Sequence, residues 1–351
     1  MDSLSLDNWI CPIPLQNYPT IVMGHGAGGK MMNDLIHHLF SAEFHSPVLK
    51  QMADAATLEV QGGRMAFTTD SFVVSPLFFP GGSIGELAVN GTVNDLASVG
   101  AKPLFLSAGF ILEEGLPMET LARVAQAMSR ACEKAGVQIA AGDTKVVNKG
   151  HGDGIYINTS GIGFIPDGVN IAPGSAQPGD VILISGSVGD HGISVMSVRE
   201  GLKFQTEILS DTAPLAGMVA NMIAAAGDIH CLRDATRGGL AAVLNELAQA
   251  SGVGLEIDEL KVPVRREVVA ACEMLGLDPL FVANEGKMVA IVPANSAEAA
   301  LAGMRNHESG RSAAIIGRVV QDHPGMVVAR TSIGGTRVVD LPAGELLPRI
   351  C

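Results

Sequence analysis

Residues 104–135 read LFLSAGFILEEGLPMETLARVAQAMSRACEKA, a strand pattern followed at once by a helix pattern. The apolar run 104–109 is typical of a short buried strand, and apolar residues recur at helical spacing over 118–135. Toward the N-terminus, 66–69 predicts another strand and 84–99 another helix. Strands that alternate with helices in this way indicate an α/β or α+β fold.

The second half of the chain repeats this alternation. A Pro/Gly-rich stretch at 165–179 precedes a strand pattern at 181–184, and a helix at 240–249, a strand at 288–292 and a helix at 296–304 follow. A chain of 351 residues, at roughly 150 residues per domain, predicts two domains. The predicted parts are an N-terminal arm at 1–19, an N-terminal domain at 20–170 whose first strand covers 19–23, a C-terminal domain at 171–340 and a tail at 341–351.

Composition excludes several classes of protein. Apolar residues make up 47% of the chain and charged residues 17%, which is typical of a packed globular protein and not of a disordered one. A net charge of −13 provides no basic surface for a nucleic-acid backbone. The sequence has neither a basic signal segment nor an uncharged apolar run of about 18 residues, so we expect no membrane span. Five cysteines without a CxxC pair indicate reduced thiols in the cytoplasm.

A glycine-rich segment at 24–30, with the sequence GHGAGGK, follows the first predicted strand and precedes a helical pattern. It fits both the dinucleotide pattern G-x-G-x-x-G and the phosphate-loop pattern G-x-x-x-x-G-K. The first pattern lacks a clear acidic residue about 20 residues later. The second has Met31 where Ser or Thr would hold magnesium. Under either interpretation, backbone N–H groups at a helix N-terminus predict an anion site.

Three separated aspartates are candidate ligands. Asp70 ends the predicted strand that begins at residue 66, Asp95 lies on the predicted helix at 84–99, and Asp143 lies in the segment GDTK at 142–145. Taken singly, each fits a helix cap or a turn. Taken together with the neighbouring side-chain oxygens of Asn94 and Thr144, they form a set of hard oxygen ligands suited to Mg²⁺ and phosphate. Asp234, before two glycines and a predicted helix, and Glu285, before the predicted strand at 288–292, are further acidic positions that favour a nucleotide site. The nine histidines show no metal-ligand spacing, so a transition-metal site is not expected.

Cys351, the last residue of the sequence, is difficult to explain as part of a core. It follows a segment that contains Pro342 and Pro348, which cannot form regular structure. Arg349 favours the thiolate form of Cys351, while the terminal carboxylate opposes it. The other cysteines lie within apolar patterns. We therefore expect Cys351 to be the only chemically essential cysteine.

Together, the motifs of residues 21–351 resemble those of the HypE family of hydrogenase maturation carbamoyl dehydratases, in the aminoimidazole ribonucleotide synthetase or PurM-like superfamily. The motifs are HGAGGK at 25–30, FFPGG at 78–82, FILEEGLPME at 110–119, GDTKVV at 142–147, DATRGG at 234–239 and PRIC at 348–351. Their order and the final cysteine make the resemblance specific. Residues 1–19, including Cys11, lie outside it and receive no function.

The resemblance implies a two-domain PurM-like fold with a flexible C-terminal tail. The N-terminal domains pair through their sheets in a homodimer, and ATP with Mg²⁺ binds in the cleft. The implied metal ligands are Asp70, Asp95, Asp143 and Asp234. The implied ATP-binding residues are His25, Gly26, Gly28, Gly29, Lys30, Asn94, Thr144 and Arg237.

The implied chemistry begins with the carbamoyltransferase HypF, which carbamoylates Cys351. ATP-dependent dehydration then leaves a thiocyanate, and the cyanide passes to iron on the HypC–HypD scaffold for nickel-iron hydrogenase. Glu285 and Lys145 match the positions expected for proton handling and oxygen activation. Because Cys351 must meet a partner outside and nucleotide inside, we expect the tail to alternate between two positions.

Two alternatives remain open from the sequence. One is another ATP-using enzyme of the superfamily, of the selenophosphate synthetase or thiamine monophosphate kinase type. Neither of those enzymes explains a terminal cysteine. The other is a thiol carrier whose tail is gated by ATP and which performs no dehydration. The amount of ATP hydrolysed for each water lost distinguishes the carrier from the dehydratase.

Overall fold

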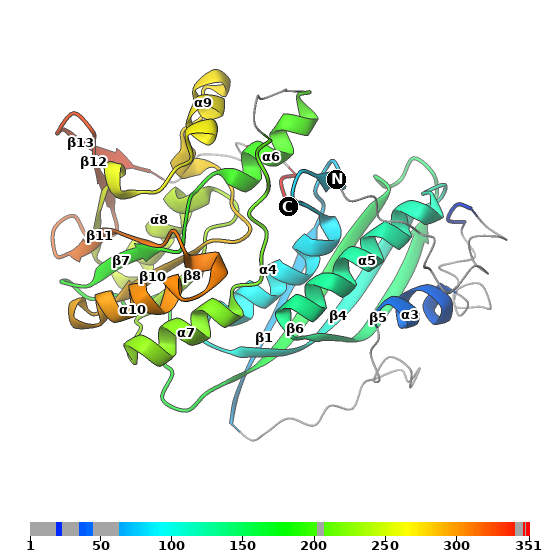
Figure 1. Ribbon diagram of the computed structural model, residues 1–351, viewed down its shortest axis with the longest axis horizontal. Helices are drawn as coiled ribbons and strands as arrows, with labels where there is room; N and C mark the ends of the chain where they lie inside the picture. Colours follow the sequence, from blue (N-terminus) through cyan, green and yellow to red (C-terminus); the bar gives the residue numbers. More distant parts are fainter. Residues whose placement is uncertain (1–18, 23–34, 45–62, 202–206, 341–346, 348) are drawn as a thin grey trace.

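Two β-sheets with helices packed on them form the protein (Figure 1). The structure is a computed structural model that describes residues 19–22, 35–44, 63–201, 207–340, 347 and 349–351. The predicted glycine-rich loop at 24–30 and most of the predicted arm lie outside these residues. In the described part the sheets contain both parallel and antiparallel pairs, so the predicted mixed helix and sheet fold is confirmed in its α+β form.

The N-terminal half is built on a four-stranded sheet with the order β1-β6-β4-β5. Only the pair β4–β5 is parallel. The crossover helix α5 joins these two strands and lies beside α4 on one face of the sheet (Figure 1). The elements of this half are η3 (Ile36–Phe40), α3 (Ser41–Glu43), β1 (Arg64–Phe72), β2 (Phe78–Phe79), β3 (Gly82–Ser83), α4 (Ile84–Ser98), β4 (Lys102–Glu113), α5 (Met118–Ala135), β5 (Gln138–Val147) and β6 (Ile155–Ile165).

The two faces of this sheet differ sharply in exposure. Side chains alternate along a strand, so Ala66 and Phe72 of β1 point toward the helices and are buried, while Phe67 points the other way and is 71% exposed. Thr68 also faces the helices, because its hydroxyl donates a hydrogen bond to Asp95 of α4. The helix-covered face is called the inner face below, and the opposite one the outer face.

The C-terminal half is built on a seven-stranded sheet with the order β13-β12-β9-β11-β7-β10-β8. Its neighbours are antiparallel except for β9 and β12. Helix α8 packs on one face of the sheet, and α7 with α10 packs on the other, each over its own apolar core. The elements are β7 (Val181–Ile184), α6 (Asp190–Arg199), α7 (Ala216–Ala226), β8 (Cys231–Asp234), α8 (Gly239–Ser251), β9 (Gly254–Asp258), η5 (Glu259–Lys261), α9 (Arg266–Leu275), η6 (Pro279–Phe281), β10 (Met288–Val292), η7 (Ala294–Ser296), α10 (Ala297–Arg305), η8 (Glu308–Gly310), β11 (Ala314–Val320), β12 (Val327–Arg330) and β13 (Thr336–Val339).

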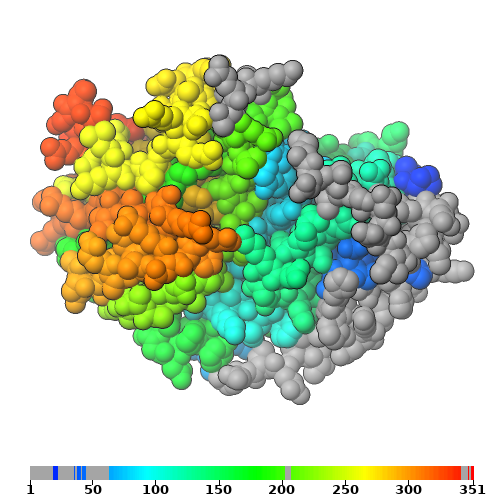
Figure 2. Space-filling view, in the orientation of Figure 1, coloured from blue at the N-terminus to red at the C-terminus, as the bar shows by residue number. Residues whose placement is uncertain are grey.

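The two halves share one apolar core where they meet. Ile193 of α6 and Val268 of α9 join the N-terminal core cluster, and so do Leu347 and Ile350 of the tail. Figure 2 shows the two halves in contact at the surface, where green and orange parts of the C-terminal half border the cyan and teal N-terminal half. The described end of the tail is therefore part of the interface between the two halves.

Most of the predicted elements are found. The helix at 118–135 and the strands at 181–184 and 288–292 have the predicted bounds, and the other predicted elements differ by a few residues at their ends. The strand predicted at 19–23 is wrong in its described part. There, Thr20 forms only an isolated bridge with Pro117, because 19–21 pairs with the turn before α5 and not with a sheet strand. The predicted domain boundary falls in the segment between β6 and β7, which contains no helix or strand.

Candidate active site

A group of carboxylates lies where the inner face of the first sheet meets the second sheet. Asp70 lies inside β1, two residues from its end, so the prediction that it ends the strand is wrong. Asp95 lies on α4, and Asp234 is the last residue of β8, paired with Met288 of β10. Burial raises the pKa of all three carboxyl groups. For Asp234, burial and the negative charge of Asp95 together raise the pKa to about 7. The structure thus brings together three of the four predicted metal ligands.

Glu285 completes this carboxylate group from the loop before β10. It is 3% exposed, and among the described residues its Oε1 has no hydrogen-bond partner. Burial raises its pKa well above the ordinary value, and the charge of Asp234 raises it further. Its main chain is held on both sides, because its N–H donates to Asp211 Oδ1 at 3.0 Å and its oxygen accepts from Asn94 Nδ2 at 3.3 Å. The backbone is fixed while the carboxyl remains able to accept a ligand or a proton.

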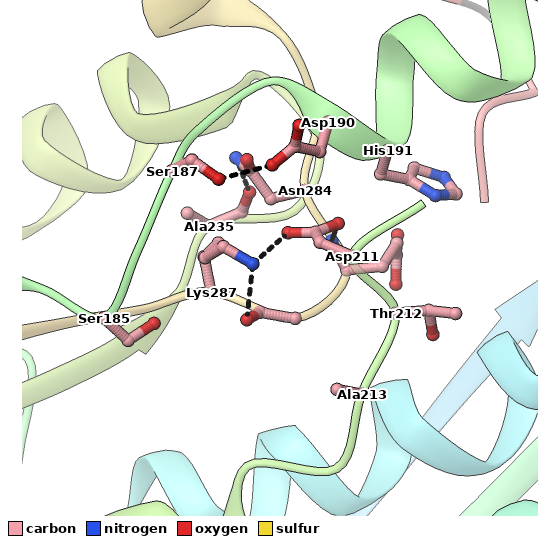
Figure 3. Close-up of polar contacts among 12 residues, drawn as sticks. Ser185, Ser187, Asp190, His191, Asp211, Thr212, Ala213, Ala235, Asn284 and Lys287 are labelled. Atoms are coloured by element: carbon pink, nitrogen blue, oxygen red, sulfur yellow. Dashed lines mark hydrogen bonds and ion pairs between the residues drawn. The ribbon is translucent and has the colours of Figure 1, made fainter. Parts of the chain in front are cut away.

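An ion pair joins Lys287, at the end of this loop, to Asp211 (Figure 3). Lys287 Nζ lies 2.9 Å from Asp211 Oδ2, and both side chains are almost buried. Although burial alone would raise the pKa of Asp211, the positive charge of Lys287 holds it below the ordinary value. Gly286 fits against this segment because a Cβ atom there would lie 1.8 Å from the Asp211 oxygen. Residues 211–213 therefore act as a rigid backing for Glu285.

His191 connects the same segment to the end of the tail. Its ring is fully buried, with Nδ1 2.8 Å from Ser210 Oγ and Nε2 2.8 Å from the Ile350 oxygen. Burial lowers its pKa, which favours the neutral ring. The main-chain oxygen of Cys351 accepts a hydrogen bond from Val73 N at 3.0 Å. The structure thus shows the tail end docked close to the segment that backs Glu285.

Cys351 differs from the other described cysteines. Its side chain is partly exposed, whereas Cys132, Cys231 and Cys272 are buried. Burial raises the pKa of Cys132 to about 12 and that of Cys272 to about 11, and it also raises that of Cys231. A thiol with a raised pKa is a poor nucleophile at neutral pH. The exposure of Cys351 agrees with the prediction that it is the reactive cysteine.

The structure does not bring Asp143 and Lys145 into the carboxylate group. Both lie on the outer face of β5, are more than half exposed, and form an ion pair with an Nζ–Oδ1 distance of 2.8 Å. Asp143 is in register with Gly109, which is in register with Asn158, and the Asn158 side chain contacts the outer-face residue Ser71. Asp143 and Lys145 therefore lie on the opposite face of the sheet from Asp70. The sequence alone does not show which face of a strand is buried. Their predicted roles in metal binding and catalysis remain predictions.

The predicted nucleotide residues have different surroundings. Asn94 is buried. Its side-chain amide donates hydrogen bonds to the main-chain oxygens of Ala213 and Glu285 and accepts one from Leu215 N, so it links the two halves. Thr144 is 2% exposed on the inner face. Arg237 is exposed, and its charge lowers the pKa of Asp70, which places it at the carboxylate group. His25, Gly26, Gly28, Gly29 and Lys30 lie outside the described residues.

Within the described ranges, no three His, Cys, Asp or Glu side chains are close enough to hold a metal ion by themselves. In the same part of the chain, no helix has the length and apolar character needed to span a membrane.

Three residues described above are not among the site residues that the sequence predicts. They are His191, Asp211 and Lys287. His191 has no metal-ligand spacing to other histidines, and Asp211 lies in a segment without helical or strand periodicity. Lys287 follows Glu285 by two residues, so the sequence offered a signal for it. None of these contacts follows from local sequence, because their partners are more than a hundred residues away or in another element.

The chain is similar to known proteins over nearly its whole length. Residues 52–165 match the family of the AIR synthase related protein, N-terminal domain, and 177–329 match its C-terminal domain. Carbamoyl dehydratase HypE of Azotobacter vinelandii is 54% identical over 332 residues, 95% of this chain and 97% of that protein. A crystal structure of hydrogenase maturation protein HypE in complex with ATP has a TM-score of 0.92 and 48% identity, covering 95% of this chain and 100% of that one. A HypE–HypF complex has a TM-score of 0.78 and 51% identity, covering 88% and 99%.

Proposed function

The chain belongs to the AIR synthase related family, in its HypE group, and from this premise we propose that it dehydrates an S-carbamoyl group on Cys351 to a thiocyanate at the expense of ATP. It is an ATP-dependent carbamoyl dehydratase that supplies cyanide ligands for the iron of nickel-iron hydrogenases. The observation that carries this conclusion is 54% identity to a carbamoyl dehydratase over 95% of the chain. The alternative superfamily enzymes are thereby set aside.

The reaction defines what the site must do. The carbamoyl oxygen is a poor leaving group. It must first bond to the γ-phosphorus of ATP, which releases ADP, and it then leaves the carbon as part of phosphate. Two protons must leave the carbamoyl nitrogen as the C≡N bond forms, and this requires a base. Sulfur, carbon and nitrogen stay on Cys351. The products are a protein thiocyanate, ADP and phosphate.

Glu285 is our candidate for the base. A carboxylate with a raised pKa holds a proton more tightly, so its ionised form is a stronger base than an ordinary glutamate. The free Oε1 and the fixed backbone support this role. Lys145 is the candidate for oxygen activation. Because it lies on the outer face, its access to the carbamoyl oxygen depends on how that face is covered in the assembled enzyme.

We infer that Mg²⁺ accompanies ATP at Asp70, Asp95 and Asp234. Asp143, which lies on the outer face, stays a separate predicted ligand. The carboxylates raise one another's pKa, and Glu285 Oε1 is buried without a hydrogen bond, so the described residues fit a divalent cation that would relieve this repulsion. When bound, Mg²⁺ supplies charge stabilisation on the phosphates. Arg237, Asn94, Thr144 and the loop at 25–30 are the proposed ATP-binding residues.

The outer face supports the proposed homodimer. Met65, Phe67 and Ile111 expose large apolar side chains there, at 47%, 71% and 47%. Such a patch on a sheet is typical of a contact between subunits. We also propose that the carbamoyltransferase HypF loads Cys351, as the solved HypE–HypF complex of a relative supports, that the HypC–HypD scaffold accepts cyanide, and that these steps occur in the cytoplasm.

Intact-mass analysis of the carbamoylated protein tests the function. We expect the protein to lose the mass of one water molecule after addition of ATP and Mg²⁺, and to keep its mass with a non-hydrolysable ATP analogue. A carbamoyl mass that persists while ATP binds would indicate a thiol carrier and not a dehydratase.

A further inference from the structure

The last three residues lie in a groove whose walls supply a hydrogen-bond donor to a main-chain oxygen of each residue. The Arg349 oxygen accepts from Ser75 N at 3.3 Å and from Arg199 Nη2 at 2.8 Å. The Ile350 oxygen accepts from His191 Nε2, and the Cys351 oxygen accepts from Val73 N. One wall is the segment after β1, and the other is helix α6.

Side chains fix the depth and direction of the tail in this groove. Ile350 is 1% exposed within the shared apolar core, and Leu347 packs on α6, where a Cβ at Gly192 would lie 3.1 Å from its Cδ1. Arg349 adopts a φ of 53°, a conformation that non-glycine residues rarely take unless their surroundings impose it. Its Nε donates to the Val73 oxygen, and its guanidinium pairs with Asp153. These contacts permit one register.

Helix α6 presents its donors on one stripe. His191, Val195 and Arg199 follow each other at intervals of four residues, so they lie on the same face of the helix. Because a carbonyl can only accept, His191 Nε2 carries the proton. Ser210 Oγ then donates to Nδ1 and accepts from Thr212 N at 3.2 Å. The ring is thus set in one tautomer, and its buried N–H is satisfied by the tail.

We propose that Val73–Ser75, His191 and Arg199 form a receptor for the chain's own residues 349–351 that fixes their register, and that His191 and Arg199 are positioning residues for the reaction at Cys351. They act by holding the two peptide oxygens that precede Cys351. The binding part of this inference rests on the contacts alone. The positioning part rests on the proposed dehydratase function.

The first test measures the rate at which iodoacetamide alkylates Cys351 in the full-length protein, quantified on the peptide that contains Cys351. Arg199→Ala and His191→Ala should each raise this rate about tenfold, because the tail spends more time outside the groove. Arg318→Ala is the matched control, since its exposed ion pair with Glu256 lies on the second sheet. Unchanged rates in both folded variants would overturn the receptor.

The second test measures single-turnover dehydration of the carbamoylated variants. We expect at least a tenfold slower reaction in Arg199→Ala and His191→Ala, and partial recovery in His191→Gln, which retains an N–H donor. His191→Gln also serves if His191→Ala does not fold. Faster alkylation with unchanged dehydration would refute the positioning role. Absence of dehydration in the parent protein and in Arg318→Ala would refute the proposed function, while the alkylation rates would still decide the receptor.

Discussion

The tail groove and the carboxylate group differ in whether their polar atoms have hydrogen-bond partners. In the groove, the main-chain oxygens of Arg349, Ile350 and Cys351 all have donors. In the carboxylate group, Glu285 has a buried oxygen without a partner, and neighbouring acids raise one another's pKa. Polar atoms that all have hydrogen-bond partners fix the conformation of a segment. Buried polar atoms without partners are stabilised when a ligand or a proton binds them. The first fits a receptor and the second a reaction site.

The largest effect should come from removing the reactive atom. Cys351→Ala should accept no carbamoyl group and form no thiocyanate, because no other described cysteine is exposed. Intact mass after treatment with the carbamoyltransferase measures this. Cys272→Ala, which removes a buried thiol, should still be carbamoylated. If Cys351→Ala still gained and dehydrated the group, the assignment of the reactive cysteine would be wrong.

Glu285→Gln tests the unsatisfied region directly. It keeps the shape of the side chain but cannot take up a proton, so dehydration should fall by about 10²–10⁴-fold while ATP binding is retained. Asp143→Asn should instead weaken magnesium-dependent ATP binding, because a hard cation prefers a charged ligand. Calorimetry and single-turnover mass analysis separate these outcomes. An equal loss of nucleotide affinity in both variants contradicts this division of roles.

Lys287→Met tests the support beneath Glu285. It leaves Asp211 buried without its partner, and we expect the free energy of unfolding to fall by about 3–5 kcal/mol, as for other broken buried ion pairs. Urea denaturation measures this. Arg318→Ala, at an exposed pair, should change stability by less than about 1 kcal/mol. The double variant Lys287→Met with Asp211→Asn should recover part of the lost free energy of unfolding. If Lys287→Met loses no more stability than Arg318→Ala, the Lys287–Asp211 ion pair does not stabilise the fold.

Asp234→Asn should give a smaller effect that depends on pH. The folded pKa of Asp234 is raised to about 7, so between about pH 4 and 7 the folded chain keeps a proton that the unfolded chain releases. Relative to the Asp234→Asn variant, the ligand-free protein should therefore lose stability as pH rises through this window. The variant lacks this dependence and should be more stable than the parent at pH 8, by on the order of 2 kcal/mol, yet similar to it at pH 4. Thermal denaturation of both proteins at both pH values measures the difference in stability, and a difference that does not grow from pH 4 to pH 8 would contradict the raised pKa of Asp234.

Local sequence patterns predicted the helices and strands better than the contacts between them. The helix at 118–135 follows from its apolar spacing and its flanking Pro117 and Gly136. The arrangement of the second sheet does not, because strand order depends on long-range pairing. The same limit explains the site. Asp70, Asp95 and Asp234 are candidate ligands from their motifs alone, but the face on which Asp143 and Lys145 lie cannot be assigned from sequence, and neither can the contact of His191 with Ile350.

The most direct test of the account measures phosphate release and thiocyanate formation on the same carbamoylated sample during one turnover. The account predicts equal amounts of both with the same time course, because the carbamoyl oxygen leaves on the γ-phosphate. Phosphate released while the carbamoyl mass persists, or thiocyanate formed without ATP, would contradict it.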